Sequence, residues 1–177
     1  QRIEVWFEDE ARFGQQGTIS RKWAPTGSRP PGVRQTQYDY LYVLGALCPA
    51  TGQSVGLLSP SLNTPVVNLF FEQFAREVDD DVHVVLIWDR AGYHTAAGVQ
   101  LPANVTVIEL PPKSPELNPV ENLWHYLRDH HWSNQAYPDY DDLFDAATDA
   151  WQASCLDPDL IKSVCHVSYL DSREVQG

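Results

Sequence analysis

The first part of the chain alternates between apolar and polar positions, as an extended strand with one buried face does. Between residues 3 and 9 the odd positions Ile3, Val5 and Phe7 share a face with Asp9, and the even positions take the other face. Residues 40–48 (YLYVLGALC) predict a second strand, and a Pro-Ala-Thr-Gly turn leads from it into a third over residues 53–58. These two strands should form an antiparallel hairpin.

A helix is predicted next, because Asn63 can cap it and Pro65 fits its first turn. Its apolar stripe is expected to contain Val66, Leu69, Phe70 and Phe74, which are spaced three or four residues apart. Residues 82–88 (VHVVLIW) form an almost continuous apolar run, which is typical of a central strand covered on both faces.

The second half of the chain predicts mainly helices. A short helix over residues 95–100 and a buried strand over residues 105–110 come first. After a Pro-Pro break, one helix should run from Asn118 to about residue 130. A last helix should begin near Asp139, with Leu143, Ala147, Ala150 and Trp151 on one face.

This order of elements predicts an α/β fold, in which a mixed sheet carries helices on its faces. Asp9 and Asp89 each follow an apolar strand segment, so both are expected where a strand ends. In open α/β sheets, that edge is where binding sites form.

Length and composition indicate a single globular domain. The 177 residues are 43% apolar and include six Trp, eight Tyr and six Phe, which is enough for a substantial core. No apolar run is long enough to span a membrane, and no secretory leader is evident, so we expect a cytoplasmic protein. Because the chain opens directly in a strand, the residues before Gln1 are expected to belong to another part of the protein.

The three cysteines, Cys48, Cys155 and Cys165, lack paired spacing and are expected to be reduced and partly buried. A zinc site that combines Cys165 and His166 with His130 and His131 is an alternative, although no CxxC or HxxxH spacing supports it.

The net charge of −12 argues against an extended nucleic-acid surface, which usually carries a basic footprint. The charge is uneven, however. Residues 1–34 hold six of the twelve basic residues against four acids, whereas residues 126–177 hold ten acids and three bases.

Three acidic segments are candidates for metal-dependent chemistry. They are residues 7–13 (FEDEARF), residues 88–94 (WDRAGYH) and residues 114–124 (SPELNPVENLW). Two-metal phosphodiester cleavage needs a few carboxylates in one small volume, because Mg²⁺ takes hard oxygen ligands and keeps several waters. Each segment also has an ordinary explanation. Asp9 fits an acidic strand end, and Asp89 fits a turn cap. Glu121 fits a capping box with Asn118, which would account for it without any metal.

Taken together, the segments resemble the catalytic motifs of mariner-like transposases and their bacterial insertion-sequence relatives in the DDE superfamily. SPELNPVENLW is close to the family's S-P-D-L-N-P-I-E-N-L-W, and DRAGYHTA resembles its second motif, D-N-x-x-x-H. FEDEARF resembles the first aspartate motif, and residues 22–27 (KWAPTG) resemble the family's W-A-P-x-G stretch. The resemblance spans roughly residues 3–155.

The resemblance implies a fold and an activity. The fold would be ribonuclease H-like, with a mixed five-stranded sheet and helices on both faces. Asp9, Asp89 and Glu121 would hold two Mg²⁺ or Mn²⁺ ions for DNA strand cleavage and strand transfer at transposon ends. Asp9 would bridge the two ions. Double-stranded DNA and a second copy of the chain are the implied partners, and the chain would be one DDE catalytic domain without the helix-turn-helix region that reads DNA.

Two departures from the family accompany this match. Arg90 stands where the family usually has Asn, and the 31 residues between Asp89 and Glu121 make a slightly short interval. His94 is a candidate to orient Asp89 or to touch the scissile phosphate, or a polar turn residue. Lys113, Arg90 and Arg12 neighbour the acids and are candidate phosphate contacts, or exposed bases without a role. Trp124, one turn after Glu121, is assigned to the core.

Two other functions compete with transposition. Another ribonuclease H-like nuclease would hydrolyse DNA without joining it. A transposase-derived module for DNA binding or assembly would lack catalysis, and Arg90 and the negative charge favour that reading. A two-carboxylate glycosidase is more distant, because it leaves the third acid unexplained.

Overall fold

A mixed sheet forms the centre of the molecule. The computed structural model describes residues 2–14, 25–26, 39–89, 98–133 and 135–170. Within these residues the strands are β1 (Arg2–Gly14), β2 (Tyr40–Leu47), β3 (Ser54–Ser59), β4 (Val82–Trp88) and β5 (Val105–Glu109). They lie in the order β3-β2-β1-β4-β5. β1 is antiparallel to β2 and parallel to β4, and β5 is parallel to β4. The prediction of a mixed five-stranded sheet is confirmed.

The first strand is longer than its apolar pattern predicts, and this changes the position of Asp9. Pairing of β1 with β4 ends at Phe7, opposite Ile87, but pairing with β2 continues to Gly14. Asp9 therefore lies in mid-strand, opposite Gly45 of β2, and not at a strand end as predicted. Asp9 does lie two residues beyond Phe7, the last residue of β1 that pairs with β4. It is therefore still close to the edge of the sheet where β4 ends.

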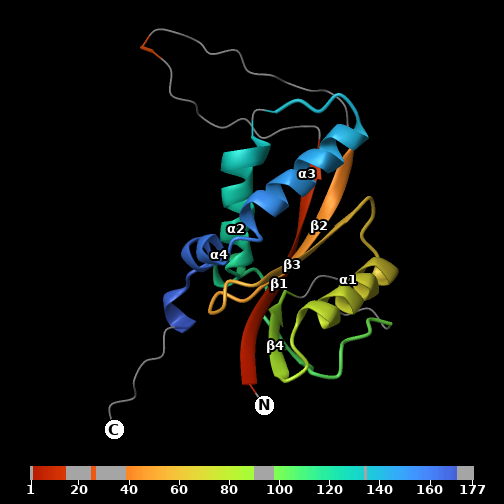
Figure 1. Cartoon of the computed structure of the whole chain (residues 1–177), viewed down its shortest axis with the longest axis vertical. Coiled ribbons are helices and arrows are strands. Elements are labelled where there is room, and N and C mark those ends of the chain that lie inside the picture. Colours follow the sequence, from red (N-terminus) through yellow and green to blue (C-terminus); the bar gives the residue numbers. More distant parts are fainter. Residues whose placement is uncertain (1, 15–24, 27–38, 90–97, 134, 171–177) are drawn as a thin grey trace.

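Helices cover both faces of the sheet (Figure 1). They are α1 (Thr64–Glu77), α2 (Val120–Leu127), α3 (Tyr140–Ser154) and α4 (Pro158–Val164). A π-helical turn over Arg128–Trp132 extends α2, so the two together match the predicted helix after Asn118. α4 was not predicted. Its first turn is capped by Asp157, whose side chain accepts from the backbone N–H groups of Asp159 and Leu160.

The face that α1 covers holds one of two hydrophobic clusters, which includes Trp6 of β1 and Leu86 of β4. The predicted capping by Asn63 is confirmed, because its side chain accepts from Val66 N. The predicted stripe is confirmed at Phe70 and Phe74, but Val66 is only half-buried and Leu69 is wrong. The buried residues of α1 are Val67, Phe70, Phe71 and Phe74, whereas Leu69 is 52% exposed. Both choices keep the three-and-four spacing, and contacts such as the edge-to-face packing of Phe74 on Trp6 decide between them.

The opposite face holds the second cluster, to which α2, α3 and α4 contribute Leu123, Leu143 and Ile161. Phe7 and Phe13 of β1 point to this face, so the predicted alternation along the strand is confirmed. Leu143, Ala147 and Ala150 of α3 are buried as predicted, and Asp139 caps the helix through Asp142 N.

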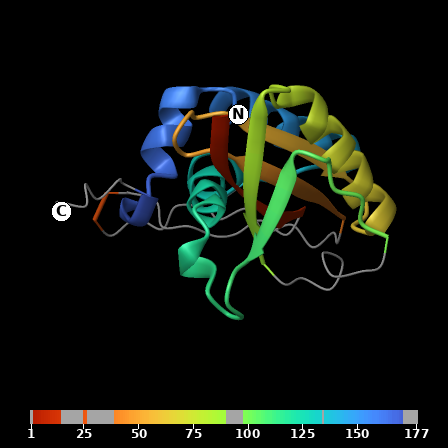
Figure 2. The same ribbon diagram turned by 90° about the horizontal axis from the view of Figure 1, so that it is seen from below.

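The buried strand predicted at residues 105–110 is instead a half-exposed edge strand over Val105–Glu109. β5 lies at the edge of the sheet with only β4 as a neighbour (Figure 2). Its Ile108 is 52% exposed. Its apolar composition is explained by the partial packing of Val105 and Val107 on the α1 side. Of the predicted short helix at residues 95–100, Gly98 lies in a turn and residues 99–100 have no regular secondary structure, and the others lie outside the described residues.

Two glycines let tryptophans lie directly on the sheet. Gly45 and Gly56 are paired across β2 and β3. A Cβ added to Gly45 would lie 2.8 Å from Cη2 of Trp124, and one added to Gly56 would lie 2.4 Å from Cζ2 of Trp151. The absence of side chains at these two positions therefore sets how closely α2 and α3 approach the sheet.

Gly56→Ala should consequently destabilise the fold by about 1–3 kcal/mol, because the new methyl group forces Trp151 out of its place. Urea unfolding at equilibrium measures this change. Adding Trp151→Leu, which makes room for the methyl group, should reduce the effect of Gly56→Ala. Additive losses in the double variant would show that the two residues do not interact in this way.

The cysteines are all buried and free, as predicted. Burial raises the pKa of the Cys165 thiol to about 12 and raises that of Cys155 as well, so these two thiols are poorly reactive. Among the described residues, no helix combines the length and the apolar character needed to cross a membrane.

Candidate active site

A cleft of about 280 Å³ opens where β4 and β5 end and α2 begins. It is lined by Asp9, Asp89, Leu110, Pro111, Pro112, Lys113, Ser114, Pro115, Asn118 and Glu121. The three carboxylates singled out in the sequence therefore line the same cleft, although 112 residues separate the first from the last. Asp9 comes from β1, Asp89 from the end of β4, and Glu121 from the first turn of α2.

The Asp9 carboxylate lies half-buried between β1 and α2. Its Oδ2 accepts a hydrogen bond from the indole Nε1 of Trp124 at 2.9 Å. Burial first, and then the neighbouring carboxylates of Glu121 and Glu10, raise the pKa of Asp9 from 3.8 to about 7, while hydrogen bonds from Trp124 and from the Glu10 backbone oppose them. A carboxyl with this pKa is desolvated and repelled by like charges, which is the state that a nearby cation would relieve.

Asp89 follows β4 directly and is exposed at the cleft. Its place is fixed by the sheet: Trp88 before it is buried, and the carbonyl oxygen of Trp88 accepts from Leu110 N at 2.8 Å. That bond keeps the end of β4 beside the segment Leu110–Pro115, which forms the other wall of the cleft. The apolar run predicted both the strand and the position of this acid at its end.

Glu121 lies in the first turn of α2, but the predicted capping box with Asn118 is not what orders the helix start. The backbone N–H of Asn118, which a capping box would pair with Glu121, donates to Pro115 O at 2.9 Å. The Asn118 side chain accepts from Val120 N at 3.1 Å and donates from Nδ2 to Glu8 O at 3.0 Å. The helix therefore begins at Val120, two residues after the predicted start at Asn118, and its start does not require the Glu121 carboxylate.

The donors in the cleft suit a hard divalent cation, because all three acids offer anionic oxygens and at least two of them repel each other. They are not gathered into a ready-made metal centre. Among the described residues, no group of three or more His, Cys, Asp or Glu side chains is arranged to hold a metal ion. The four residues of the alternative zinc site, which all belong to the described part of the chain, form no such group either. Binding would thus draw the three carboxylates closer together.

The candidate accessory residues are placed differently from one another. Lys113 lines the cleft, is exposed, and has a φ of 60°, an unusual conformation for a residue other than glycine. Arg12 lies on β1 with its guanidinium 4.9 Å from the centre of the Tyr40 ring. Arg12 is not among the described residues that line the cleft. Arg90 and His94 lie outside the described residues.

Comparison with protein families identifies the chain. Residues 4–144 match the family model described as DDE superfamily endonuclease. The chain belongs to the DDE superfamily of endonucleases. A relative from Sinorhizobium fredii (strain NBRC 101917 / NGR234), named uncharacterized protein y4pE/y4sA, is 41% identical over 125 residues, which is 71% of this chain and 93% of that protein.

Solved structures support the ribonuclease H-like fold of this DDE endonuclease. The Mos1 mariner paired-end complex with Mn has a TM-score of 0.71 at 14% identity, covering 92% of this chain and 52% of that one. The Mos1 Strand Transfer Complex has a TM-score of 0.65 at 18% identity, covering 93% and 50%. The chain spans about half the length of the Mos1 chains. The expected family and fold are thus both confirmed.

Two residues of the candidate site escaped the sequence analysis. Trp124 was assigned to the core, and it is indeed 1% exposed, but its indole N–H also contacts Asp9. Asn118 was interpreted only as a helix cap, yet its amide also binds the backbone of β1 beside Asp9. The available signal was spacing: Trp124 follows Glu121 by three residues, so both side chains lie on neighbouring turns of one helix face.

Proposed function

We propose that this chain is the catalytic domain of a DNA transposase, which cleaves DNA strands at transposon ends and joins them to a target. The observation that carries the proposal is the meeting of Asp9, Asp89 and Glu121 in one cleft at the end of the parallel strands. Membership of the DDE endonuclease superfamily supports it, and so does the likeness in fold to Mos1.

Within this proposal, Asp9, Asp89 and Glu121 hold two Mg²⁺ or Mn²⁺ ions. The bound ions would supply an activated oxygen nucleophile and stabilise the leaving oxygen. The chain's own part is to place its oxygens around that position. β1 and β4 present two carboxylates from a rigid sheet, and α2 presents the third. Lys113, which lines the cleft and is exposed, would bind a DNA phosphate.

We propose double-stranded DNA as the substrate, and a homodimer as the acting form. One Mos1 structure is a strand transfer complex and another is a paired-end complex with the left transposon end, which supports DNA as the substrate. The net charge of −12 makes this domain a poor DNA reader by itself. We therefore propose that a helix-turn-helix region of the full protein recognises the transposon end.

Strand joining is the test that separates transposition from hydrolysis. The full-length protein is incubated with Mn²⁺, a supercoiled plasmid and a fluorescent DNA duplex with free 3′-hydroxyl ends. We expect fluorescence to become covalently attached to the plasmid. Nicking of the plasmid without attachment of the fluorescent DNA would contradict transposition. It would indicate that the protein only hydrolyses DNA, as another ribonuclease H-like nuclease would.

A non-catalytic module for DNA binding or assembly is the second candidate, and the lack of a ready-made three-ligand cluster among the described residues favours it. Calorimetry separates the two. We expect the protein to bind Mn²⁺, and Asp89→Asn to weaken that binding at least tenfold. If neither protein binds Mn²⁺, the module is the better account.

A further inference from the structure

Two hydrogen bonds connect the region where α2 begins to two consecutive residues of β1, Glu8 and Asp9. Trp124 Nε1 donates to Asp9 Oδ2 at 2.9 Å, and Asn118 Nδ2 donates to Glu8 O at 3.0 Å. Both donor residues are buried, at 1% and 5% exposure. Glu121 lies between these two donors in the sequence. The pair of bonds therefore links the strand that carries Asp9 to the helix turn that carries Glu121.

The indole ring is itself held in place. Trp124 packs over Gly45, the residue opposite Asp9 in β2, where a Cβ would come within 2.8 Å of the ring. Trp151 lies against it with ring centroids 6.4 Å apart. A donor fixed in this way restricts rotation of the Asp9 carboxylate. It binds Oδ2 of a carboxylate that a hydrogen bond from the Glu10 backbone also holds, against the repulsion from Glu121.

We propose that Trp124 is a positioning residue for the metal site: its indole N–H holds the Asp9 carboxylate in the orientation that binds a divalent ion together with Glu121. The inference rests on the proposed function, because it takes Asp9 and Glu121 as ligands of that ion. It goes further in assigning a role at the site to a residue that would otherwise only fill the core.

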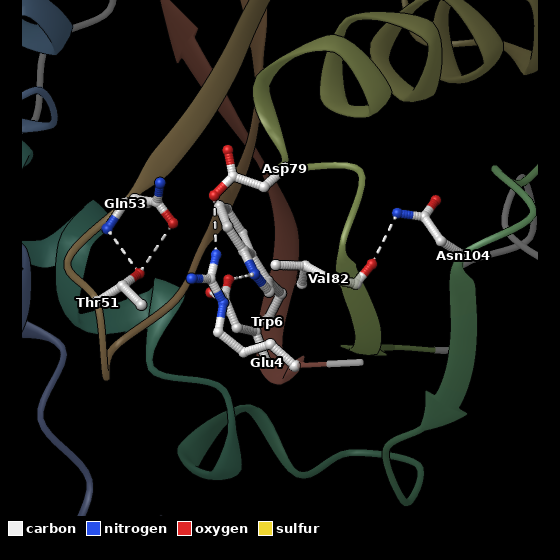
Figure 3. Close-up of polar contacts among 8 residues, drawn as sticks. Glu4, Trp6, Thr51, Gln53, Asp79, Val82 and Asn104 are labelled. Carbon is white, nitrogen blue, oxygen red and sulfur yellow. Dashed lines mark hydrogen bonds and ion pairs between the residues drawn. The ribbon is translucent and has the colours of Figure 1, made fainter.

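The same strand supplies a matched control. Trp6 is also 1% exposed, and its Nε1 donates to a carboxylate of β1, Glu4 Oε2, at 2.9 Å. Figure 3 shows this pair beside Asp79. The bond lies on the α1 face of the sheet, and neither residue lines the cleft. Trp6→Phe thus removes an equivalent ring and an equivalent hydrogen bond without touching the site.

The experiment compares Mn²⁺ affinity, by calorimetry, in the wild-type protein and in Trp124→Phe, Trp6→Phe and Asp9→Asn. We expect Trp124→Phe to bind Mn²⁺ about 10- to 100-fold more weakly. Trp6→Phe should bind within about twofold of wild type, at a comparable loss of melting temperature. Equal weakening in both Phe variants, or none in Trp124→Phe, would overturn the positioning role. Retained binding in Asp9→Asn would overturn the proposed function and this inference with it.

A measurement on the wild-type protein keeps the inference testable if Trp124→Phe does not fold. Paramagnetic Mn²⁺ broadens nuclear resonances near its binding site. In a spectrum of the assigned indole N–H groups, substoichiometric Mn²⁺ should broaden the Trp124 resonance and leave that of Trp6 sharp. Loss of both resonances together, or of neither, would contradict the inference.

Discussion

Glu121→Gln should lower the rates of cleavage and joining by at least about 10²–10³-fold, whereas the fold should be retained. Removal of a single donor that stabilises developing charge already costs about 10²–10³-fold in other enzymes, and loss of a metal ligand should cost no less. The fold should tolerate the change because the start of α2 is ordered by Asn118 and Pro115 and does not use the Glu121 carboxylate. The rate of strand joining in Mn²⁺ measures the effect.

Glu116→Gln provides the matched control for this variant. Glu116 lies five residues earlier in the same segment, is exposed, and is not among the described residues that line the cleft. Its substitution should leave the joining rate within about twofold of wild type. If Glu121→Gln were as active as Glu116→Gln, the third acid would be a helix-start residue and not a metal ligand.

Asp9→Asn should stabilise the metal-free protein at pH 8, by about 2–4 kcal/mol. The pKa of Asp9 is raised from 3.8 to about 7, first by burial and then by Glu121 and Glu10. Asparagine keeps the size and the acceptor for Trp124 but carries no charge, so the variant avoids the burial of a repelled carboxylate. Urea unfolding in the presence of a chelator measures the difference.

The sign of the pH dependence follows from the raised pKa. Between about pH 4 and pH 7 the unfolded chain releases the Asp9 proton while the folded chain keeps it, so the free energy of unfolding of the wild type falls as the pH rises. The advantage of Asp9→Asn should therefore be below about 1 kcal/mol at pH 4 and largest above pH 7. Asp145→Asn, at an exposed position on α3, is the charge-matched control for this comparison. An advantage independent of pH would contradict the raised pKa.

Strong local patterns made much of the sheet and its acids predictable. The almost continuous apolar run before Asp89 is typical of a buried strand, so the end of that strand could be located from the sequence. Alternation placed Asp9 on the face of Phe7, and the structure confirms that face. The segment from Asn118 to Trp124 combines helix-start residues with a family motif, which located the third acid within one residue of the helix start.

The parts that could not be predicted depend on tertiary contacts. Residues 8–12 are mostly charged, so nothing in their pattern shows that β1 continues along β2 to Gly14. The face of α1 was ambiguous, because apolar residues occupy two adjacent stripes and only packing on Trp6 selects one. The bond from Trp124 to Asp9 joins residues 115 positions apart, and sequence gives no hint of where a buried indole N–H points.

A crystal structure of the protein with Mn²⁺, with the ions located by their anomalous scattering, tests the central claim most directly. We expect manganese in the cleft, with oxygens of Asp9, Asp89 and Glu121 all within bonding distance. Manganese bound elsewhere, or held in the cleft while the Glu121 carboxylate stays turned away from it, would contradict the account.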